Sequence, residues 1–346
     1  MARIIVEEQS TTKHAPLEKH PENPGRILVL VNNLSRQGFT VEHVSRRVDV
    51  EEARRTAARV HAKGYIQYLE RLSRNKYSVI DEDTYLTEDS MELAYTTFQT
   101  SYELALSLAE PVFYVSRPPG HHAGKGGKAM RAPSQGFCLL NNAAAAVLGF
   151  KDRGFNRIAV MDFDVHHGNG TMEIFYDKRI LQVDLHQHPD TLYPFTGYSF
   201  EIGAGEGYGF KANLVFNPFT GDDVYLRVLN MVHELLEQYN PEALVVSAGF
   251  DGFLNDGLAD LRLTEASYAA LGRLIRSLGT HTLVILEGGY SVGLTRGVEA
   301  FLHGLNGREV SYEVSKTISV ARGEEILKVN EKTILKIKEK ALGRGG

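Results

Sequence analysis

Short apolar runs alternate along this chain with segments of helical periodicity, and this alternation limits the folds available to it. An unbroken apolar run between turn residues is typical of a strand buried on both faces, as in a parallel sheet. Such runs separated by helices, with no low-complexity linker, predict βα units in an α/β fold with a mainly parallel sheet. The expected strands are Ile4 to Glu7, Val112 to Ser116, Ile158 to Phe163, Ile180 to Leu185, Ala243 to Ser247 and Thr282 to Leu286.

Helices are expected where apolar residues recur at helical spacing, at 91–106 and 225–239. Another should run from a cap at Thr264 to a stop at Gly279. A lysine-rich amphipathic helix near the C-terminus carries Leu327, Ile334, Ile337 and Ala341 on its apolar side. We expect one main domain of residues 1–310 and a C-terminal extension of residues 311–346 whose helix docks on that domain. A partner-binding role for this helix is the alternative.

Composition excludes several classes of partner. The net charge is −5 and no block of basic residues is present, so direct nucleic-acid binding is not expected. No apolar run approaches the ~18 residues of a membrane span, and no signal peptide is recognisable. A single cysteine forms no internal disulfide and builds no thiolate cluster, which fits a reducing compartment. We therefore expect a cytoplasmic protein whose metal ligands, if any, are histidines and carboxylates.

Polar residues follow several of the expected strands. In an open parallel sheet the ligand crevice lies at the carboxyl ends of the strands, where these residues converge. Asp162 and Asp164 share one face of their strand, because side chains alternate with period two, and His166 follows where the strand ends. Asp164, His166 and, after another strand, Asp251 form a ligand set suited to zinc or ferrous iron. Three protein ligands leave the open coordination position that catalysis requires; the alternative is ordinary loop capping.

Two further segments suggest proton handling. His121 and His122 follow the stiff Pro118-Pro119-Gly120, with Asp162 and Asn169 as expected hydrogen-bond acceptors behind them. Paired imidazoles suit amide hydrolysis, because the water must lose a proton and the departing amine must gain one; exposed loop histidines are the alternative. Tyr290 follows two glycines and could stabilise an oxyanion, or be a plain turn tyrosine. Cys138 is expected to be a buried, inert thiol.

Together these motifs resemble the zinc-dependent histone deacetylase superfamily, which includes acetylpolyamine amidohydrolases and acetoin-utilisation proteins. Asn169, where many class I members have Asp, makes the chain similar to the class II-like and prokaryotic branch. The resemblance implies the three-layer arginase/deacetylase fold, with residues 1–310 as the catalytic domain. The motifs that carry it, in order, are Arg-Pro-Pro-Gly-His-His (117–122), Gly-Phe-Cys (136–138), Asp-Phe-Asp-Val-His-His-Gly-Asn-Gly-Thr (162–171), Gly-Phe-Asp (249–251) and Glu-Gly-Gly-Tyr (287–290).

Site roles follow from the resemblance. It implies one zinc on Asp164, His166 and Asp251, with Fe(II) as the alternative ion. It also implies His121 and His122 as the catalytic pair and Tyr290 as the transition-state tyrosine. The substrate tunnel and rim would comprise Gly136, Phe137, Tyr193 (in place of the usual Phe), Leu258 and Asp83. A structural potassium site would use Asp162, Asp164, His166, Asp184 (in place of Ser) and Leu185.

The expected reaction is metal-assisted removal of an acetyl or related acyl group from a lysine side chain of a protein or peptide. An acetylated polyamine is the alternative substrate, and association of the chain with itself is compatible with the family. Leu258 lies where a polyamine-preferring relative has Glu, whereas acidic residues around Asp83 would attract either cationic substrate. A binuclear ureohydrolase is disfavoured because Gly168 stands where a bridging Asp is needed. A non-enzymatic acyl-lysine binder is the remote alternative.

Overall fold

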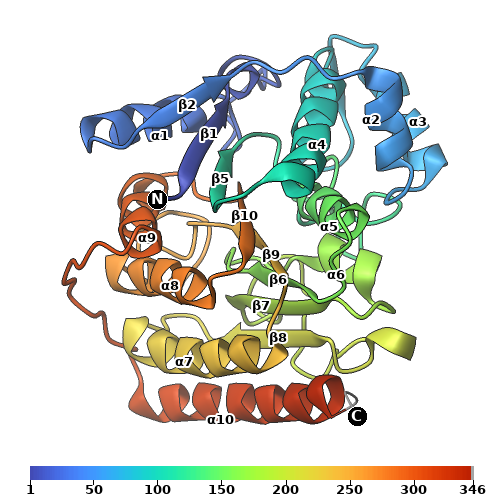
Figure 1. The fold of residues 1–346 in the computed structure, drawn as a ribbon. Coiled ribbons are helices and arrows are strands. Elements are labelled where there is room, and N and C mark those ends of the chain that lie inside the picture. Colours follow the sequence, from blue (N-terminus) through green and yellow to red (C-terminus); the bar gives the residue numbers. More distant parts are fainter. Residues whose placement is uncertain (344–346) are drawn as a thin grey trace.

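The central layer of the molecule is an eight-stranded parallel sheet (Figure 1). The computed structural model describes residues 1–343. The strand order is β2-β1-β5-β10-β9-β6-β7-β8, so strands distant in the sequence meet at the centre of the sheet. The strands are β1 (Arg3–Glu7), β2 (Val41–Val44), β5 (Val112–Val115), β6 (Ile158–Asp162), β7 (Leu181–Gln187), β8 (Lys211–Phe216), β9 (Ala243–Ala248) and β10 (His281–Leu286).

The six expected strands are all present, but β2 and β8 were not predicted. Both are edge strands. In β2 two adjacent exposed polar residues, Glu42 and His43, separate the valines, while β8 begins with Lys211 and contains Asn213, so neither strand forms a continuous apolar run. A separate antiparallel pair, β3 (Tyr77–Val79) and β4 (Tyr85–Thr87), was also not predicted.

Helices cover both faces of the sheet, which confirms the three-layer α/β fold (Figure 1). Successive strand residues enter opposite cores: in β5, Phe113 and Val115 belong to one and Val112 and Tyr114 to the other. The first core is completed by α1 (Gly25–Arg36), α7 (Asp222–Tyr239), α8 (Glu265–Leu278), α9 (Val298–Leu305) and α10 (Val320–Ile337); the second by α2 (Val50–Ala57), α3 (Lys63–Leu72), α4 (Ser90–Ser107), α5 (Asn142–Asp152) and α6 (Asn169–Phe175).

The predicted ends of α8 are confirmed. The Thr264 side chain accepts a hydrogen bond from the amide of Ala266, and Gly279 ends the helix with a left-handed φ of 60°. Helices α4 and α7 likewise occupy the two segments in which helical periodicity was found.

Helix α10 packs against α7 and the edge strand β8 (Figure 1). Its apolar side, including Ile326, Leu327, Ile334 and Ile337, is buried in the first core. The Asn330 side chain accepts from the Val215 amide and donates to the Val215 carbonyl, both at 3.0 Å, and so pairs with the open edge of β8. Residues 344–346 of the predicted extension lie outside the described residues.

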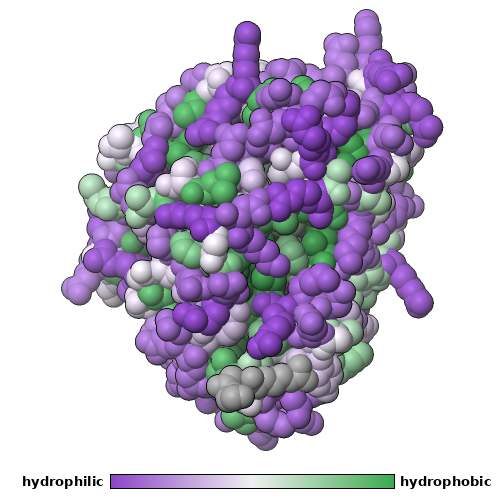
Figure 2. Space-filling model, turned by 45° about the vertical axis from the view of Figure 1, so that its right-hand side comes forward, coloured by the Kyte–Doolittle hydropathy of each residue, from purple (hydrophilic) through white to green (hydrophobic). Residues whose placement is uncertain are grey.

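The described surface is mainly hydrophilic on the face drawn in Figure 2, where hydrophobic residues gather in a hollowed area near its centre. Within residues 1–343, every helix is either too short or too polar to cross a membrane.

Candidate metal centre and active site

The three predicted metal ligands meet just beyond the carboxyl ends of β6 and β9. One potential ligand atom from each of Asp164, His166 and Asp251 lies within 4.8 Å of the others. His166 Nδ1 is 3.0 Å from Asp164 Oδ1 and 3.0 Å from Asp251 Oδ2. Both carboxylates are buried, and His166 is only partly exposed. A buried cluster with two carboxylates and one imidazole fits a divalent ion such as zinc or ferrous iron.

Backbone groups hold the two carboxylates in place. The Gly288 amide donates to Asp164 Oδ2 at 2.8 Å, and the Val165 amide donates to Asp251 Oδ1 at 3.0 Å. A Cβ at Gly288 would lie 2.3 Å from Asp251 Oδ2 and 2.5 Å from Asp164 Oδ2, so a side chain at this position would displace both ligands. Glycine is therefore needed where β10 runs into the site.

The adjacent histidines lie beside this cluster, with ring centroids 4.0 Å apart and different partners. His121 Nδ1 is 3.0 Å from Asp162 Oδ2, and His122 Nδ1 is 2.7 Å from Asn169 Oδ1. The Asn169 amide nitrogen donates to the Ala129 carbonyl, which turns its oxygen toward His122. Nδ1 of His122 therefore carries the proton, and Nε2 is left as the acceptor.

Charge separates the two imidazoles further. Burial by itself lowers the pKa of His121, but the carboxylates of Asp162, Asp164 and Glu287 outweigh burial and raise this pKa well above its ordinary value. Burial lowers the pKa of His122, and the neighbouring His121 and His166 lower it further. His121 therefore favours the protonated form and His122 the neutral form, so the two rings are suited to different proton-handling roles.

A pocket opens over the cluster and is lined by every residue predicted for the tunnel and rim: Asp83, Gly136, Phe137, Tyr193 and Leu258. The Tyr193 hydroxyl donates a hydrogen bond to the Ser134 carbonyl at 3.0 Å, so its proton is engaged by the wall of the pocket. His121, His122 and Tyr290 line the same pocket, so the proposed proton carriers and the phenol face one space.

Tyr290 is fixed by two residues that the sequence did not identify. The Asp256 carboxylate accepts from the amides of Tyr290, Ser291 and Gly293 at 2.7–2.8 Å. The Arg26 guanidinium stacks 4.6 Å from the centre of the Tyr290 ring and donates to the carbonyls next to it, at Gly289 and Glu287. Burial raises the pKa of Tyr290 well above its ordinary value, so the phenol keeps its proton.

These residues were missed for different reasons. Asp256 lies five positions after Asp251, where a sequence signal was available but resembles any turn aspartate. Arg26 is on α1, and only the tertiary fold brings it to Tyr290. The buried pair of Arg117 and Glu22, joined at 2.5 and 2.7 Å, was also missed; it anchors the segment that leads to His121 and His122.

Residues of the predicted potassium site lie on neighbouring strands. Asp184 on β7 pairs in register with Asp162 on β6, and both are buried. The Asp184 carboxylate accepts from the Gly168 amide at 3.0 Å and lies 2.6 Å from His186 Nδ1. Protein groups thus already form hydrogen bonds with both oxygens of Asp184. The potassium site, which would also involve Asp164, His166 and Leu185, stays a prediction.

A buried two-carboxylate, one-imidazole cluster beside a histidine pair, at the carboxyl edge of a parallel sheet, defines a metal-hydrolase type of site. The histone deacetylase domain matches residues 20–305 of the chain. The chain belongs to the histone deacetylase family, whose members are metal-dependent deacetylases.

The relatives of this chain carry two kinds of name. A protein from Archaeoglobus fulgidus named "Probable deacetylase" is 34% identical and covers 84% of this chain and 82% of its own. Acetylpolyamine amidohydrolase 1 of Pseudomonas aeruginosa is 38% identical, with 62% of each chain covered. The crystal structure of the HDA15 HD domain superposes with a TM-score of 0.82 at 29% identity, and the match covers 99% of this chain and 96% of that one.

Proposed function

We propose that this protein is a zinc-dependent amidohydrolase that removes acetyl groups from lysine side chains of proteins or peptides. The observation that carries this proposal is the convergence on one pocket of the Asp164, His166 and Asp251 cluster, the histidine pair and Tyr290. A bound zinc ion would polarise the amide carbonyl and lower the pKa of the attacking water.

The chain's own groups supply the proton steps. His122 Nε2, unprotonated because Nδ1 bonds Asn169, accepts the proton of the attacking water and returns it to the departing amine. His121, held protonated by Asp162, provides positive charge beside the reacting carbonyl. The Tyr290 hydroxyl donates a hydrogen bond to the developing oxyanion. The products are acetate and a primary amine.

Pocket shape favours a long, linear acyl-amine. Phe137, Tyr193 and Pro119 provide apolar walls for the methylene chain of acetyl-lysine. Asp83 stands at the pocket with one oxygen bonded to Thr84 Oγ1 at 2.7 Å and the other to Ser134, so its carboxylate is held in place. From there it can accept a hydrogen bond from a substrate backbone amide.

An acetylpolyamine is the second candidate substrate. It is favoured by the similarity to acetylpolyamine amidohydrolase 1 and by Asp81 and Asp83, which lie close together near the pocket and would attract a cationic chain. Leu258 opposes it, because an apolar side chain offers no ion pair to a distal ammonium group.

The test compares kcat/KM for acetyl-lysine peptides with that for acetylputrescine and acetylspermidine, using wild type and Leu258→Glu. We expect wild type to prefer the peptides, and Leu258→Glu to shift the ratio toward polyamines by at least about 10-fold, since ~1.4 kcal/mol corresponds to that factor. Chelation should abolish turnover and added zinc should restore it. A wild-type preference for polyamines would contradict the lysine assignment, and activity that survives chelation would contradict the metal mechanism.

A further inference from the structure

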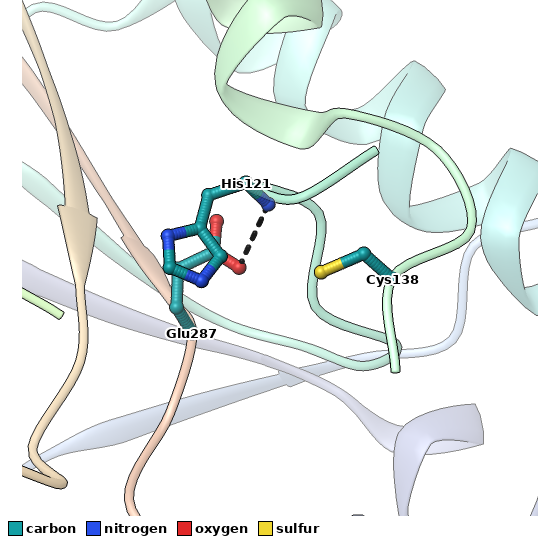
Figure 3. Close-up of side chains that lie close together, drawn as sticks. All are labelled: His121, Cys138 and Glu287. Atoms are coloured by element: carbon teal, nitrogen blue, oxygen red, sulfur yellow. Dashed lines mark hydrogen bonds between the residues drawn. The ribbon is translucent and has the colours of Figure 1, made fainter. Parts of the chain in front are cut away.

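Directly behind the histidine pair, His121, Cys138 and Glu287 form a second cluster of potential ligands (Figure 3). They come from three separate segments: the loop after β5, the loop before α5 and the end of β10. One ligand atom from each lies within 4.8 Å of the others. All three side chains are buried, with 3%, 0% and 1% of their surface exposed, so the cluster lies in the interior of the protein and not on its surface.

The cluster contains an unpaired acceptor. Glu287 Oε2 accepts from the amides of Gly120 and His121 at 2.7 and 3.3 Å, which fixes the carboxylate (Figure 3). Its other oxygen, Oε1, is buried and has no hydrogen-bond partner within residues 1–343. A buried acceptor without a partner is energetically unfavourable, so binding of a donor or a metal ion to Oε1 would be favoured.

The other two members also have free coordination capacity. His121 Nδ1 is engaged with Asp162, whereas Nε2 has only a distant neighbour in Asp164 Oδ1, at 3.9 Å. The Cys138 sulfur accepts one long contact, 3.4 Å from the His122 amide. An imidazole, a thiolate and a carboxylate are all zinc ligands, and the thiolate favours soft ions over Mg²⁺ or Ca²⁺.

We propose that His121, Cys138 and Glu287 form a second transition-metal site, and that a zinc ion bound there inhibits the enzyme. The sequence predicts an inert thiol at Cys138, but the fold places Glu287 and His121 beside it. Binding displaces the thiol proton of Cys138 and the Nε2 proton of the His121 imidazolium, and both protons are released to solvent. A second ion on His121 would lie close to the first site, because His121 Nε2 is 3.9 Å from Asp164 Oδ1. Because two dications repel each other, the second site fills only at higher metal concentration.

Inhibition is expected because the second ion would bind His121, a residue of the proposed active site. Coordination of His121 Nε2 takes up the imidazole that is proposed to provide positive charge beside the reacting carbonyl, and holds it away from that role. This consequence rests on the proposed role of His121, whereas the binding of the metal does not. Activity should therefore rise with the first equivalent of zinc and fall with further zinc, by about 100-fold if one group that stabilises the transition-state charge is lost.

Cobalt titration of the metal-free protein tests the site. Cys138 is the only cysteine of the chain, and Asp164, His166 and Asp251 contribute no sulfur. Near-ultraviolet thiolate-to-cobalt absorption therefore reports the second site alone. We expect it to develop with the second equivalent of Co²⁺ and to be absent in Cys138→Ala, which should still bind the first equivalent. In Glu287→Gln the second equivalent should bind at least about 10-fold more weakly. Thermal melting checks that both variants are folded.

Activity supplies the second arm, measured as the ratio of kcat at high zinc to kcat at stoichiometric zinc within each variant. The ratio should be far below one in wild type and near one in Cys138→Ala. Absence of thiolate-to-metal absorption in wild type, or its persistence in Cys138→Ala, would overturn the site. Equal zinc inhibition in both proteins would overturn the inhibitory role. If the protein had no deacetylase activity, the proposed function would fail while the absorption measurement would still decide the site.

Discussion

His121 and His122 are neighbours in the chain, yet their side chains have different partners. A carboxylate faces one ring and an amide faces the other. The partner sets the protonation of each ring, because a carboxylate stabilises an imidazolium far more than an amide does. At the scale of single residues, the proposed mechanism therefore depends on Asp162 and Asn169, which lie behind the rings and are not among the residues that line the pocket.

Tyr290→Phe should lower kcat on an acetyl-lysine peptide by about 10²–10³-fold, because one donor to the oxyanion is lost. The Asp164, His166 and Asp251 cluster is untouched, so zinc content by elemental analysis should stay at the wild-type value. Near-normal turnover in Tyr290→Phe would contradict the proposed role of the phenol. Loss of zinc would show that the substitution acts through the metal site and not through the oxyanion.

At the scale of elements, the segment after β9 serves the site twice. It carries the ligand Asp251 and, five residues later, Asp256, which binds three backbone amides of the loop holding Tyr290. Leu258, two residues further on, lines the pocket. The position of the phenol is thereby tied to a segment that lines the pocket.

Asp256→Asn should lower kcat about 10- to 100-fold, since an amide cannot accept all three bonds and a misplaced catalytic group is costly. In the Tyr290→Phe background the same change should have little further effect, because the group being positioned is gone. Asp223→Asn is the matched control: Asp223 also accepts two backbone amides and a hydroxyl, but at the start of α7. Additive losses in the double variant would indicate a purely structural role.

The extension is the other element with a specific task. We propose that residues 311–343 belong to the folding unit of the catalytic domain, because α10 buries the first core and closes the β8 edge. An uncovered edge strand would expose backbone groups that invite association with another chain.

Asn330→Ala should lower the free energy of unfolding by about 1–3 kcal/mol, because the buried amide and carbonyl of Val215 lose their partners. Denaturant unfolding measures this loss. Glu331→Ala, at the exposed neighbouring position of α10, should change stability by less than about 0.5 kcal/mol. Equal effects of the two substitutions would show that the Asn330 bonds contribute nothing specific.

At the scale of the whole molecule, buried neutral histidines link stability to pH. Burial lowers the pKa of His61 to about 4 and that of His14 to about 3. His61 is held as a neutral ring, with Nδ1 2.8 Å from the Gly124 carbonyl and Nε2 accepting from the Asn141 amide at 3.0 Å.

The unfolded chain takes up a proton at His61 below about pH 6.5, whereas the folded chain does so only near pH 4. The free energy of unfolding should therefore be highest above pH 6.5 and fall as pH is lowered toward 4, by roughly 3 kcal/mol from this residue. His61→Gln should remove that part of the pH dependence, as measured by unfolding at pH 7, 5.5 and 4.5. His43→Gln, at an exposed position, is the control substitution for the loss of a histidine.

Prediction from the sequence succeeded where the pattern is local. Continuous apolar runs identified the buried strands, and the Thr264 and Gly279 signals identified the ends of α8. It failed for β2 and β8 because polar residues interrupt both apolar runs: Glu42 and His43 in the exposed β2, and Lys211 and Asn213 in β8, which is buried. Such a segment becomes a strand only by pairing with a neighbouring strand, and that pairing depends on residues elsewhere in the sequence.

The sequence by itself determined the fold class, the family resemblance and the chemical types that gather at the strand ends, because strand period and short motifs are local properties. Only the tertiary structure decided which side chains meet: that Asp256 and Arg26 hold Tyr290, that Asn330 closes the edge of β8, and that Cys138 lies beside His121 and Glu287. The physical reason is that these contacts join segments far apart in the chain, and packing of helices on both faces of one sheet brings them within bonding distance.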